Sequence, residues 1–325
     1  MAHTMADELA LAPDKKSAAV IKTILEAGEV LDKLPVQTVD SLEVDQLRWS
    51  EIPAVAFRLP NEGFGEGTGK VERVSYGIAI IGHEIDSDII YEKTKHNVKP
   101  RTLYTEQTLE SINYTINDTI LNGDKASDPR SFDGLKKIST ALPSRQLVDR
   151  NPGASSATTL DLRNGGVDSA TRQSFFDRFN RAKRVVRGGK PDLAVANENV
   201  IDLVDAMLRR EGLYKDTQDK FERTVMVIKG IPLVDAGYKD MDGDELILAN
   251  DHDVPDAGTK ETSIYLLKLD SKRDVGLLQL HSISTRDLGE LQTKPVRRTR
   301  IDWALGIAVW GKHSLARMNK LQVAS

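Results

Sequence analysis

One short segment brings together the residue types that most readily bind a metal ion. In the sequence GHEIDSD, His83, Glu84, Asp86 and Asp88 lie close together. Imidazole and carboxylate groups are ligands of zinc and other divalent metals, so His83, Asp86 and Asp88 could serve a metal-dependent enzyme. The segment follows a strand-like run, however, and a polar turn is the more common explanation of such a position.

A second acidic segment, KDMDGDELILANDHD, resembles a calcium-binding loop at first sight. Asp240, Asp242 and Asp244 occupy positions 1, 3 and 5 of that motif. Position 6 requires glycine and is Glu245, and position 12 requires glutamate and is Asp251. With these two defects, a solvated acidic turn before a strand is the better interpretation.

Other catalytic signatures are missing from the sequence. There is no cysteine, which excludes disulfides, cysteine-zinc sites and thiol catalysis, and there is no Gly-x-Ser-x-Gly or His-Glu-x-x-His motif. The 45 Lys and Arg residues against 49 Asp and Glu give a net charge of −4, which argues against a dedicated nucleic-acid binder. We therefore expect no catalytic residue, no cofactor and no bound metal.

A glycine-rich segment, PNEGFGEGTGKVERV at residues 60–74, could be mistaken for a phosphate-binding loop. In a P-loop, the residue after Gly69-Lys70 would be Ser or Thr, but it is Val71, and Phe64 stands where the first glycine belongs. The segment also leads into a strand-like run and not into a helix that could hold an anion. We interpret it as the long, flexible tip of a hairpin.

The segments on either side of these glycines predict the two arms of that hairpin. EIPAVAFRLP precedes the tip, and VERVSYGIAIIG follows it with the alternating apolar pattern of a strand. Two arms of roughly ten residues would project by about 33 Å at ~3.3 Å per residue. Because an isolated two-stranded ribbon is marginal in water, another surface must cover it.

The remaining pattern mixes helices and strands without a regular alternation, which indicates the α+β class. Residues 105–122 form the clearest helix, with an apolar stripe that includes Leu109 and Ile116. Further helices are expected over 15–34, around 169–187 and around 197–212. Alternation over 301–309 predicts a strand, and HSLARMNKL near the end is expected to form a helical turn. The length of 325 residues suggests about two domains, and no stretch is apolar enough to span a membrane.

Two segments concentrate positive charge. One runs from Arg172 to Lys190, and the other contains Lys294, Arg297, Arg298 and Arg300. A solvated face, or pairing with acidic residues elsewhere, is the simpler explanation of both. The functional alternative is an inner face that lies near nucleic acid through phosphate contacts alone, with these candidate residues: Arg178, Arg181, Lys183 and Arg184.

Taken in order, these segments resemble the major capsid proteins of tailed bacteriophages, which share the Johnson fold. The resemblance rests on IPAVAFRLPNEGFGEGTGKVERVSYGIAIIGHEIDSD, on TLESINYTINDTILNGD running into SDPRSFDGLKK, on ETSIYLLKLD, and on RIDWALGIAVWGKHSLARMNKLQV. It covers nearly the whole chain. The regions that it implies, with approximate boundaries, are an N-terminal arm (1–50), an extended β-hairpin loop (51–82), a peripheral domain (83–140) with a spine helix at about 100–122, a mainly axial domain (141–285) and a C-terminal β or peripheral return (286–325).

The function that this resemblance implies is self-assembly into an icosahedral shell around double-stranded phage DNA, in the virion, after assembly in the bacterial cytoplasm. In that family the extended loop lies over an adjacent subunit of a hexamer or pentamer. The expected contact residues are Phe57, Arg58, Phe64, Lys70, Glu72 and Arg73. The expected hinge residues are Gly63, Gly65, Gly67 and Gly69. Separate scaffolding, cement and portal proteins are further candidate partners, and no membrane is expected.

Two alternatives remain at this point. An encapsulin-type bacterial cage would have the same fold, although this sequence has a long N-terminal arm and no opening typical of encapsulins. A metal-dependent enzyme using His83, Asp86 and Asp88 would belong to another class altogether.

Overall fold

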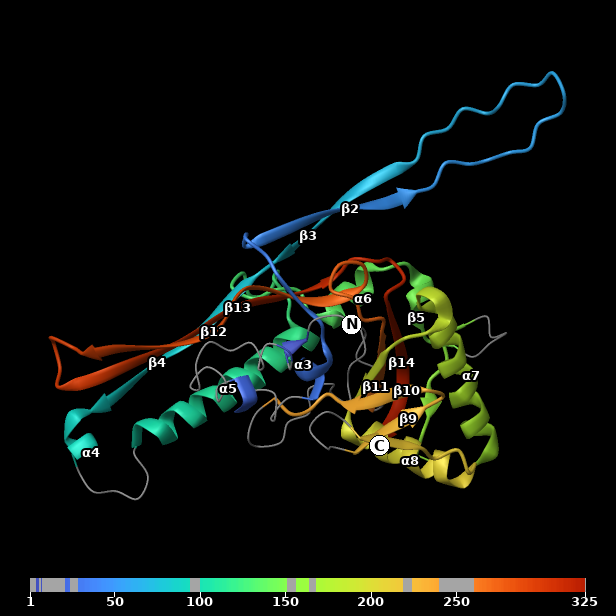
Figure 1. The fold of residues 1–325 in the computed structure, drawn as a ribbon. Helices are drawn as coiled ribbons and strands as arrows, with labels where there is room; N and C mark the ends of the chain where they lie inside the picture. Colours follow the sequence, from blue (N-terminus) through green and yellow to red (C-terminus); the bar gives the residue numbers. More distant parts are fainter. Residues whose placement is uncertain are drawn as a thin grey trace.

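The computed structural model describes residues 4–5, 7, 21–23, 29–93, 100–150, 156–163, 168–218, 224–239 and 260–324. The chain forms an elongated body from which one hairpin projects far into solvent (Figure 1). Helices and strands are mixed along the chain, so the α+β prediction is confirmed. Among the described residues, no helix is both long and apolar enough to cross a membrane.

A long sheet forms one half of the body. Within the described residues it has four strands, in the order β1 (Val36–Thr38), β12 (Val275–Glu290), β13 (Val296–Val309) and β4 (Ala79–Asp88). The first pair is parallel and the other two pairs are antiparallel. Ile301 and Trp303 of β13 are buried on one face of this sheet.

Helix α5 (Pro100–Asn122) runs along β4 on one face of the long sheet (Figure 1). Its apolar stripe, which includes Leu109 and Ile116, is buried, and this confirms the helix expected at about 100–122. Gly123 follows the helix, and glycine is required there because a Cβ would meet the carbonyl oxygens of Phe132 and Thr119 at 2.4 and 2.5 Å. The chain then turns back, and α6 (Leu135–Ala141) packs against α5.

A second sheet forms the other half of the body. Its strands among the described residues are β5 (Leu147–Val148), β14 (Leu315–Ala324), β11 (Lys260–Leu267), β7 (Leu193–Ala196), β10 (Ile231–Asp235), β9 (Thr224–Ile228) and β8 (Asp216–Gln218), with β6 (Leu160–Asp161) also paired to β14. Helices α7 (Ser169–Val185) and α8 (Glu198–Arg210) bury Phe175, Phe179 and Met207 in a core with Ile264 and Met318 of this sheet. A separate core surrounds α5 and the long sheet.

The projecting hairpin is made of β2 (Glu43–Glu51) and β3 (Lys70–Gly77), and residues 52–69 between them belong to no strand. The first arm is therefore 43–51 and not the expected EIPAVAFRLP, and the ribbon starts before the expected boundary at residue 51. Only Ile78 separates β3 from β4, so the second arm continues almost directly into the long sheet.

One other sequence expectation needs correction. Residues 315–321 of the segment HSLARMNKL belong to strand β14 and not to a helical turn, and β14 pairs with β11 in the second sheet. The proposed division into domains stays a prediction; its boundaries at 82/83 and 285/286 lie within β4 and β12.

Short elements complete the description: α3 (Glu29–Lys33), α4 (Ile89–Lys93), and the 3₁₀ turns η1 (Ser144–Gln146) and η2 (Arg187–Gly189). Residues 21–23 are also helical, which agrees with the helix expected over 15–34, although the rest of that span before α3 lies outside the described residues. All of the acidic segment at 240–251, considered above for calcium, lies outside them as well.

Candidate intersubunit surfaces

The outer part of the hairpin exposes an unusual amount of apolar surface. Every residue from 49 to 71, which we call the arm, is exposed to solvent. The relative exposure is 74% for Trp49, 94% for Val55 and 108% for Phe57. Solvent-exposed apolar patches of this kind usually mark a surface that binds another protein.

Ion pairs link the two strands of the ribbon. Arg48 Nη2 lies 2.6 Å from Glu72 Oε1, and Lys70 Nζ lies 2.9 Å from Glu51 Oε2. Arg73 pairs in the same way with Asp45. Hydrogen bonding from Arg48 lowers the pKa of the Glu72 carboxyl group, with a smaller contribution from Lys312 of the body.

These pairs bear on the predicted contact residues. Lys70, Glu72 and Arg73 are already paired within the hairpin, where opposite charges on neighbouring strands stabilise the register. Their predicted role in orienting a neighbouring subunit stays a prediction.

The tip of the arm is an ordered turn. The Arg58 guanidinium lies 4.7 Å from the centre of the Phe64 ring, and its Nη1 donates to the carbonyl oxygen of Glu62 at 3.1 Å. The backbone N–H of Leu59 donates to Glu62 Oε2 at 2.9 Å. Asn61 has a positive φ of 70°, a conformation that asparagine tolerates better than most residues. Phe57 and Phe64 thus project from a turn with a defined shape.

The four glycines of the arm have different surroundings. A Cβ added to Gly63, Gly65 or Gly67 would meet no atom within 4 Å, and none of the three has a positive φ. A Cβ on Gly69 would lie 2.9 Å from the carbonyl oxygen of Glu51 and 3.0 Å from Pro53. The structure gives a steric reason for glycine at position 69 alone, and the hinge role of all four stays a prediction.

A buried tyrosine packs the base of the hairpin against the body. The Tyr76 hydroxyl donates to the carbonyl oxygen of Val309, and its ring meets the Trp310 ring edge-on at 5.2 Å. Burial raises the pKa of Tyr76. Gly306 of β13 lies against the end of β3, where a Cβ would come within 2.5 Å of the Gly77 carbonyl oxygen. This close approach requires glycine at position 306.

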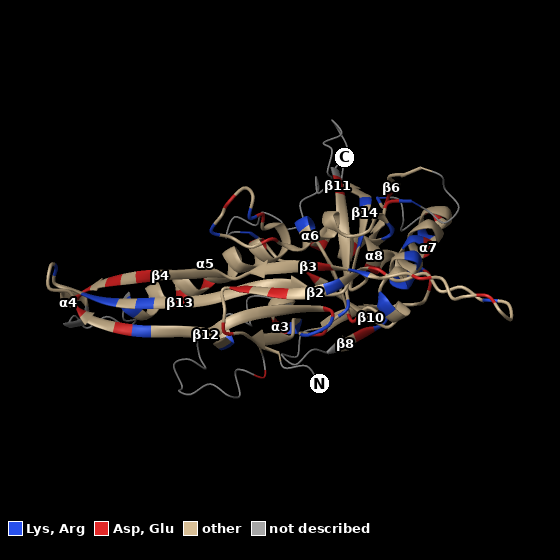
Figure 2. Cartoon of the chain, turned by 90° about the horizontal axis from the view of Figure 1, so that it is seen from above, with Lys and Arg blue, Asp and Glu red and all other residues tan. Residues whose placement is uncertain are grey.

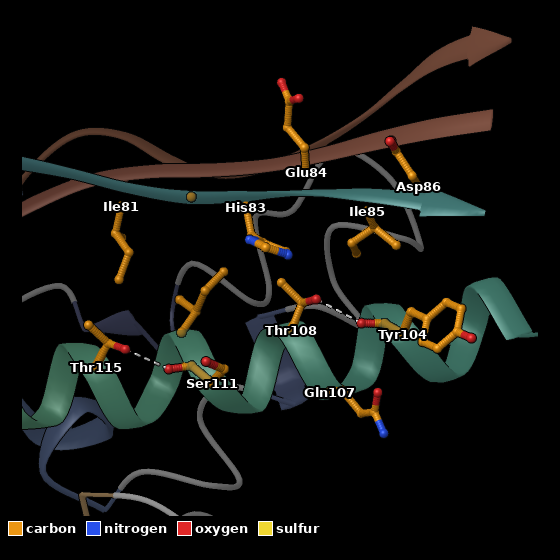
Figure 3. A pocket seen from close by; sticks show the side chains of 12 residues that line it. Ile81, His83, Glu84, Ile85, Asp86, Tyr104, Gln107, Thr108, Ser111 and Thr115 are labelled. Atoms are coloured by element: carbon orange, nitrogen blue, oxygen red, sulfur yellow. Dashed lines mark hydrogen bonds between the residues drawn. The ribbon is translucent and has the colours of Figure 1, made fainter. Parts of the chain in front are cut away.

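A groove runs between β4 and α5 on the body (Figure 3). Its volume is about 510 Å³, and Ile81, His83 and Ile85 of β4 point into it. On the helix side, Thr108 and Thr115 donate their hydroxyls to backbone carbonyls one turn earlier, at 2.8 and 2.9 Å. With these hydroxyls already bonded, the groove is less polar than its sequence indicates.

The candidate metal ligands do not converge on one point. Strand alternation directs His83 toward α5, whereas Glu84 and Asp86 point away from the helix (Figure 3). Asp88 instead accepts a hydrogen bond from the backbone N–H of Ile90 at 2.9 Å. Within the part of the chain that the structure describes, no group of three His, Asp or Glu side chains could hold a metal ion.

The acidic residues of β4 are partners of the second basic cluster. Arg298 contacts both Glu84 and Asp86, and Arg300 contacts Glu84, in rows of alternating charge across the sheet (Figure 2). Hydrogen bonds from these arginines lower the pKa of both carboxyl groups. Pairing with acidic residues was the simpler explanation of this cluster, and for Arg298 and Arg300 it is confirmed.

The first basic cluster requires a correction at Arg178. This side chain is fully buried and donates to the carbonyl and hydroxyl oxygens of Thr158, and burial lowers its pKa to about 10. It lies three residues after buried Phe175, on the inner side of α7. Because it is inaccessible, Arg178 cannot lie against DNA.

The other three candidates of that cluster differ in accessibility. Arg184 is exposed, whereas Arg181 and Lys183 are half-buried. Arg181 Nη1 lies 3.5 Å from the carbonyl oxygen of Arg150, and Lys183 Nζ donates to the carbonyl oxygen of Lys229 at 3.1 Å. Their proximity to DNA stays a prediction.

Sequence reasoning missed an apolar patch on the ribbon. Leu47, Trp49 and Val71 are exposed on one face, and Trp49 pairs directly with Val71. The alternating pattern of EVDQLRWSE could have predicted this patch. Val44 packs against the core, and strand alternation places Leu47 and Trp49 on the opposite face. The patch extends the apolar surface of the arm toward the body.

Comparison with known proteins finds structures of similar fold, although no similar sequence. No protein-family model and no curated protein matches the chain. Solved structures do match it at low identity. The SrpI encapsulin from Synechococcus elongatus PCC 7942, in its holo complex, has a TM-score of 0.59 at 14% identity, covering 91% of this chain and 88% of the other. The capsid of a native GTA particle has a TM-score of 0.57 at 11% identity, covering 94% and 91%.

A phage structure matches over a still larger share of the chain. Microbacterium phage Oxtober96 has a TM-score of 0.56 at 10% identity, covering 97% of this chain and 98% of the other. The architecture described above is thus that of capsid and encapsulin shell proteins. It is the Johnson fold, as the resemblance to tailed-phage capsid proteins implied.

Proposed function

We propose that this chain is a major capsid protein that self-assembles into an icosahedral shell and encloses the double-stranded DNA of a bacteriophage. The observation that carries the proposal is the arm, which extends away from its own subunit with its apolar side chains uncovered (Figure 1). A ribbon with so little support from its own chain requires a partner surface. In a shell of identical subunits, that partner is another copy.

The body offers a second exposed apolar surface at its opposite end. Ile90 and Tyr91 of α4 and Leu103 and Tyr104 of α5 are exposed there, next to the groove between β4 and α5. The arm leaves the body at the other end (Figure 1). We assign the groove end as the surface on which the arm of a neighbour lies.

Two different surfaces at opposite ends of one subunit produce a head-to-tail interface. Such heterologous contacts generate closed rings when the rotation between neighbours closes. We propose hexamers and pentamers as those rings, with the glycines of the arm accommodating both. Each contact can be weak, because simultaneous engagement of many contacts raises the effective concentration.

The same proposal includes partners and location. Packaged DNA would be contacted without sequence specificity, and separate scaffolding, cement and portal proteins would assist assembly. The chain would act as a structural protein and not as an enzyme, with no membrane partner. Assembly would take place in the bacterial host cytoplasm, and the product would be the virion.

Electron microscopy of the purified full-length protein tests the proposal. We expect closed shells, or rings of five and six subunits. A homogeneous monomer at all concentrations and salt conditions would contradict it, as would metal-dependent turnover by that monomer.

An encapsulin-type cage is the second candidate, because the SrpI encapsulin gives a TM-score of 0.59, slightly above the 0.57 of the GTA capsid and the 0.56 of the Microbacterium phage structure. The contents of shells isolated from the native source separate the two. Nuclease-protected double-stranded DNA supports the phage proposal, whereas a packaged protein without DNA supports the cage.

A further inference from the structure

The β9–β10 turn beside α7 contains a lysine whose position is unfavourable for three separate reasons. Lys229 and Gly230 form the two-residue turn, with φ angles of 50° and 82°. Turns with two positive φ angles favour Asn-Gly or Asp-Gly, since other side chains are strained in the first position. Lysine therefore carries a backbone cost that asparagine would largely avoid.

The charge environment of Lys229 adds the second and third costs. Partial desolvation lowers its pKa, and the positive charges of Lys183 and Arg184 lower it further, with Asp177 acting in the opposite direction. Among the described residues, three cations thus face one carboxylate. Figure 2 shows the concentration of positive charge along α7.

The lysine is nevertheless held in a defined position. Its Nζ donates to Asn180 Oδ1 at 2.9 Å and lies 5.1 Å from the centre of the Phe176 ring. Lys183 Nζ in turn donates to the carbonyl oxygen of Lys229 at 3.1 Å. Phe176, Asn180 and Lys183 lie on one face of α7, at spacings of four and three residues.

We propose that Lys183, Arg184 and Lys229, which we call the cation triad, bind the phosphate backbone of double-stranded nucleic acid. Bound phosphates would neutralise the mutual repulsion of the triad, and the fixed ammonium of Lys229 would lose little freedom on binding. Backbone strain, such as the positive φ of Lys229, occurs more often at functional sites than elsewhere in proteins. The choice of nucleic acid as the anion rests on the proposed function.

The test measures binding of a fluorescent 25-base-pair duplex to the unassembled full-length protein at several salt concentrations between 50 and 200 mM. Wild type is compared with the triple variant Lys183→Gln, Arg184→Gln and Lys229→Gln. The matched control removes three exposed positive charges elsewhere: Lys125→Gln, Arg145→Gln and Lys272→Gln. Circular dichroism establishes that each variant is folded.

We expect the slope of log K against log salt to fall by about 2–3 for the triad variant, since each phosphate contact contributes ~0.9. At 100 mM salt its affinity should fall by about tenfold or more, with the control close to wild type. Equal affinity and slope for triad variant and wild type would overturn the proposal. An equal loss in the control would also overturn it, because net charge alone would then explain binding.

Two further measurements separate this inference from the proposed function. A polyglutamate peptide that binds as tightly as the duplex, with the same dependence on the triad, would overturn the assignment to nucleic acid. Shell formation is scored independently by electron microscopy. Shells without triad-dependent DNA binding refute this inference alone, whereas triad-dependent binding by a protein that never assembles refutes the proposed function alone.

Discussion

Arg298 on β13 and Asp86 on β4 form a two-point ion pair, in which Nε lies 2.6 Å from Oδ1 and Nη2 lies 2.7 Å from Oδ2. The same guanidinium donates to Glu84 at 2.7 Å. These bonds lie on the face of the long sheet that points away from α5, and they join the edge strand β4 to the rest of the sheet. Ionic contacts thus add to the backbone pairing of β4 with β13 on this face of the sheet.

Replacement of Arg298 by Gln should lower the melting temperature measurably at pH 7, because shared and bidentate pairs are exceptions to the weakness of surface salt bridges. The pKa of Glu84 and of Asp86 is lowered in the folded state. Their contribution is therefore complete above the unfolded pKa values of about 4 and is lost as pH falls through the lower folded values. The difference between wild type and variant should shrink between pH 5 and pH 2.

Thermal unfolding followed by circular dichroism checks this prediction, with Arg286→Gln on neighbouring β12 as the control. A difference that is the same size at pH 7 and at pH 2 would show that lost packing, and not charge, explains the effect.

Replacement of Tyr76 by Phe should cost about 1 kcal/mol of stability, because it removes the buried hydrogen bond to the Val309 carbonyl oxygen. The raised pKa of Tyr76 means that its contribution is complete below the unfolded value of about 10 and is lost as pH rises through the folded value. Denaturant unfolding at pH 7 and pH 11 measures both effects. An unchanged midpoint at pH 7 would mean that the hydroxyl does not anchor the hairpin.

Substitution of Trp49 or Phe57 by Ser should leave the subunit folded and abolish or strongly reduce assembly. Both side chains are exposed in the isolated chain, so their removal costs little internal stability. Loss of a buried aromatic anchor at an interface costs about 2 kcal/mol or more per contact. Electron microscopy and sedimentation measure assembly, and Leu213→Ser, an equally apolar change at another exposed site, should assemble normally.

Deletion of residues 61–69 should give a folded subunit that forms no shells. The deleted residues are all exposed and lie beyond the strands, so both cores remain intact. Particles that match wild type in size and yield would count against the arm as the assembly element.

Substitution of Gly63, Gly65 and Gly67 together by Ala should have no effect on folding, because each Cβ enters open space. If these residues are hinges, shells should form with lower yield or in aberrant sizes, since alanine restricts the backbone. Gly69→Ala should instead disturb the base of the arm through contact with Glu51 and Pro53. Normal shells from the triple variant would show that Gly63, Gly65 and Gly67 do not act as hinges.

Helix α5 could be predicted because its buried residues recur with the helical period. Strand β13 could be predicted because large and small side chains alternate over 301–309, although residues 303–309 are all buried. β14 could not, since residues 315–319 are all buried and no alternation remains. In that strand Leu315 and Met318 lie three residues apart, a spacing that also suits a helix, and Lys320 interrupts the extended backbone with a φ of 58°. The strand depends on pairing with β11, which is distant in sequence.

Among the candidate site residues, those marked by local sequence signals were predicted better than those placed by contacts between distant segments. The arm was found because glycines and flanking alternation are local signals, yet its first strand was placed too late, at 51 and not at 43. Arg178 was misjudged, although its spacing of three from Phe175 places it on the buried face of α7. The environment of Lys229 depends on α7 lying beside a turn more than forty residues later, which no local pattern reveals.

The near-continuity of β3 and β4 through Ile78 has a mechanical consequence. In the proposed shell, a neighbour that pulls on the tip loads both arms of the hairpin. The β3 arm passes its share of the tension through Ile78 into β4, where Arg298 pairs with Glu84 and Asp86. Adjacent subunits would then be coupled in tension as well as by adhesion. A deformation at one ring could be transmitted from subunit to subunit across the shell.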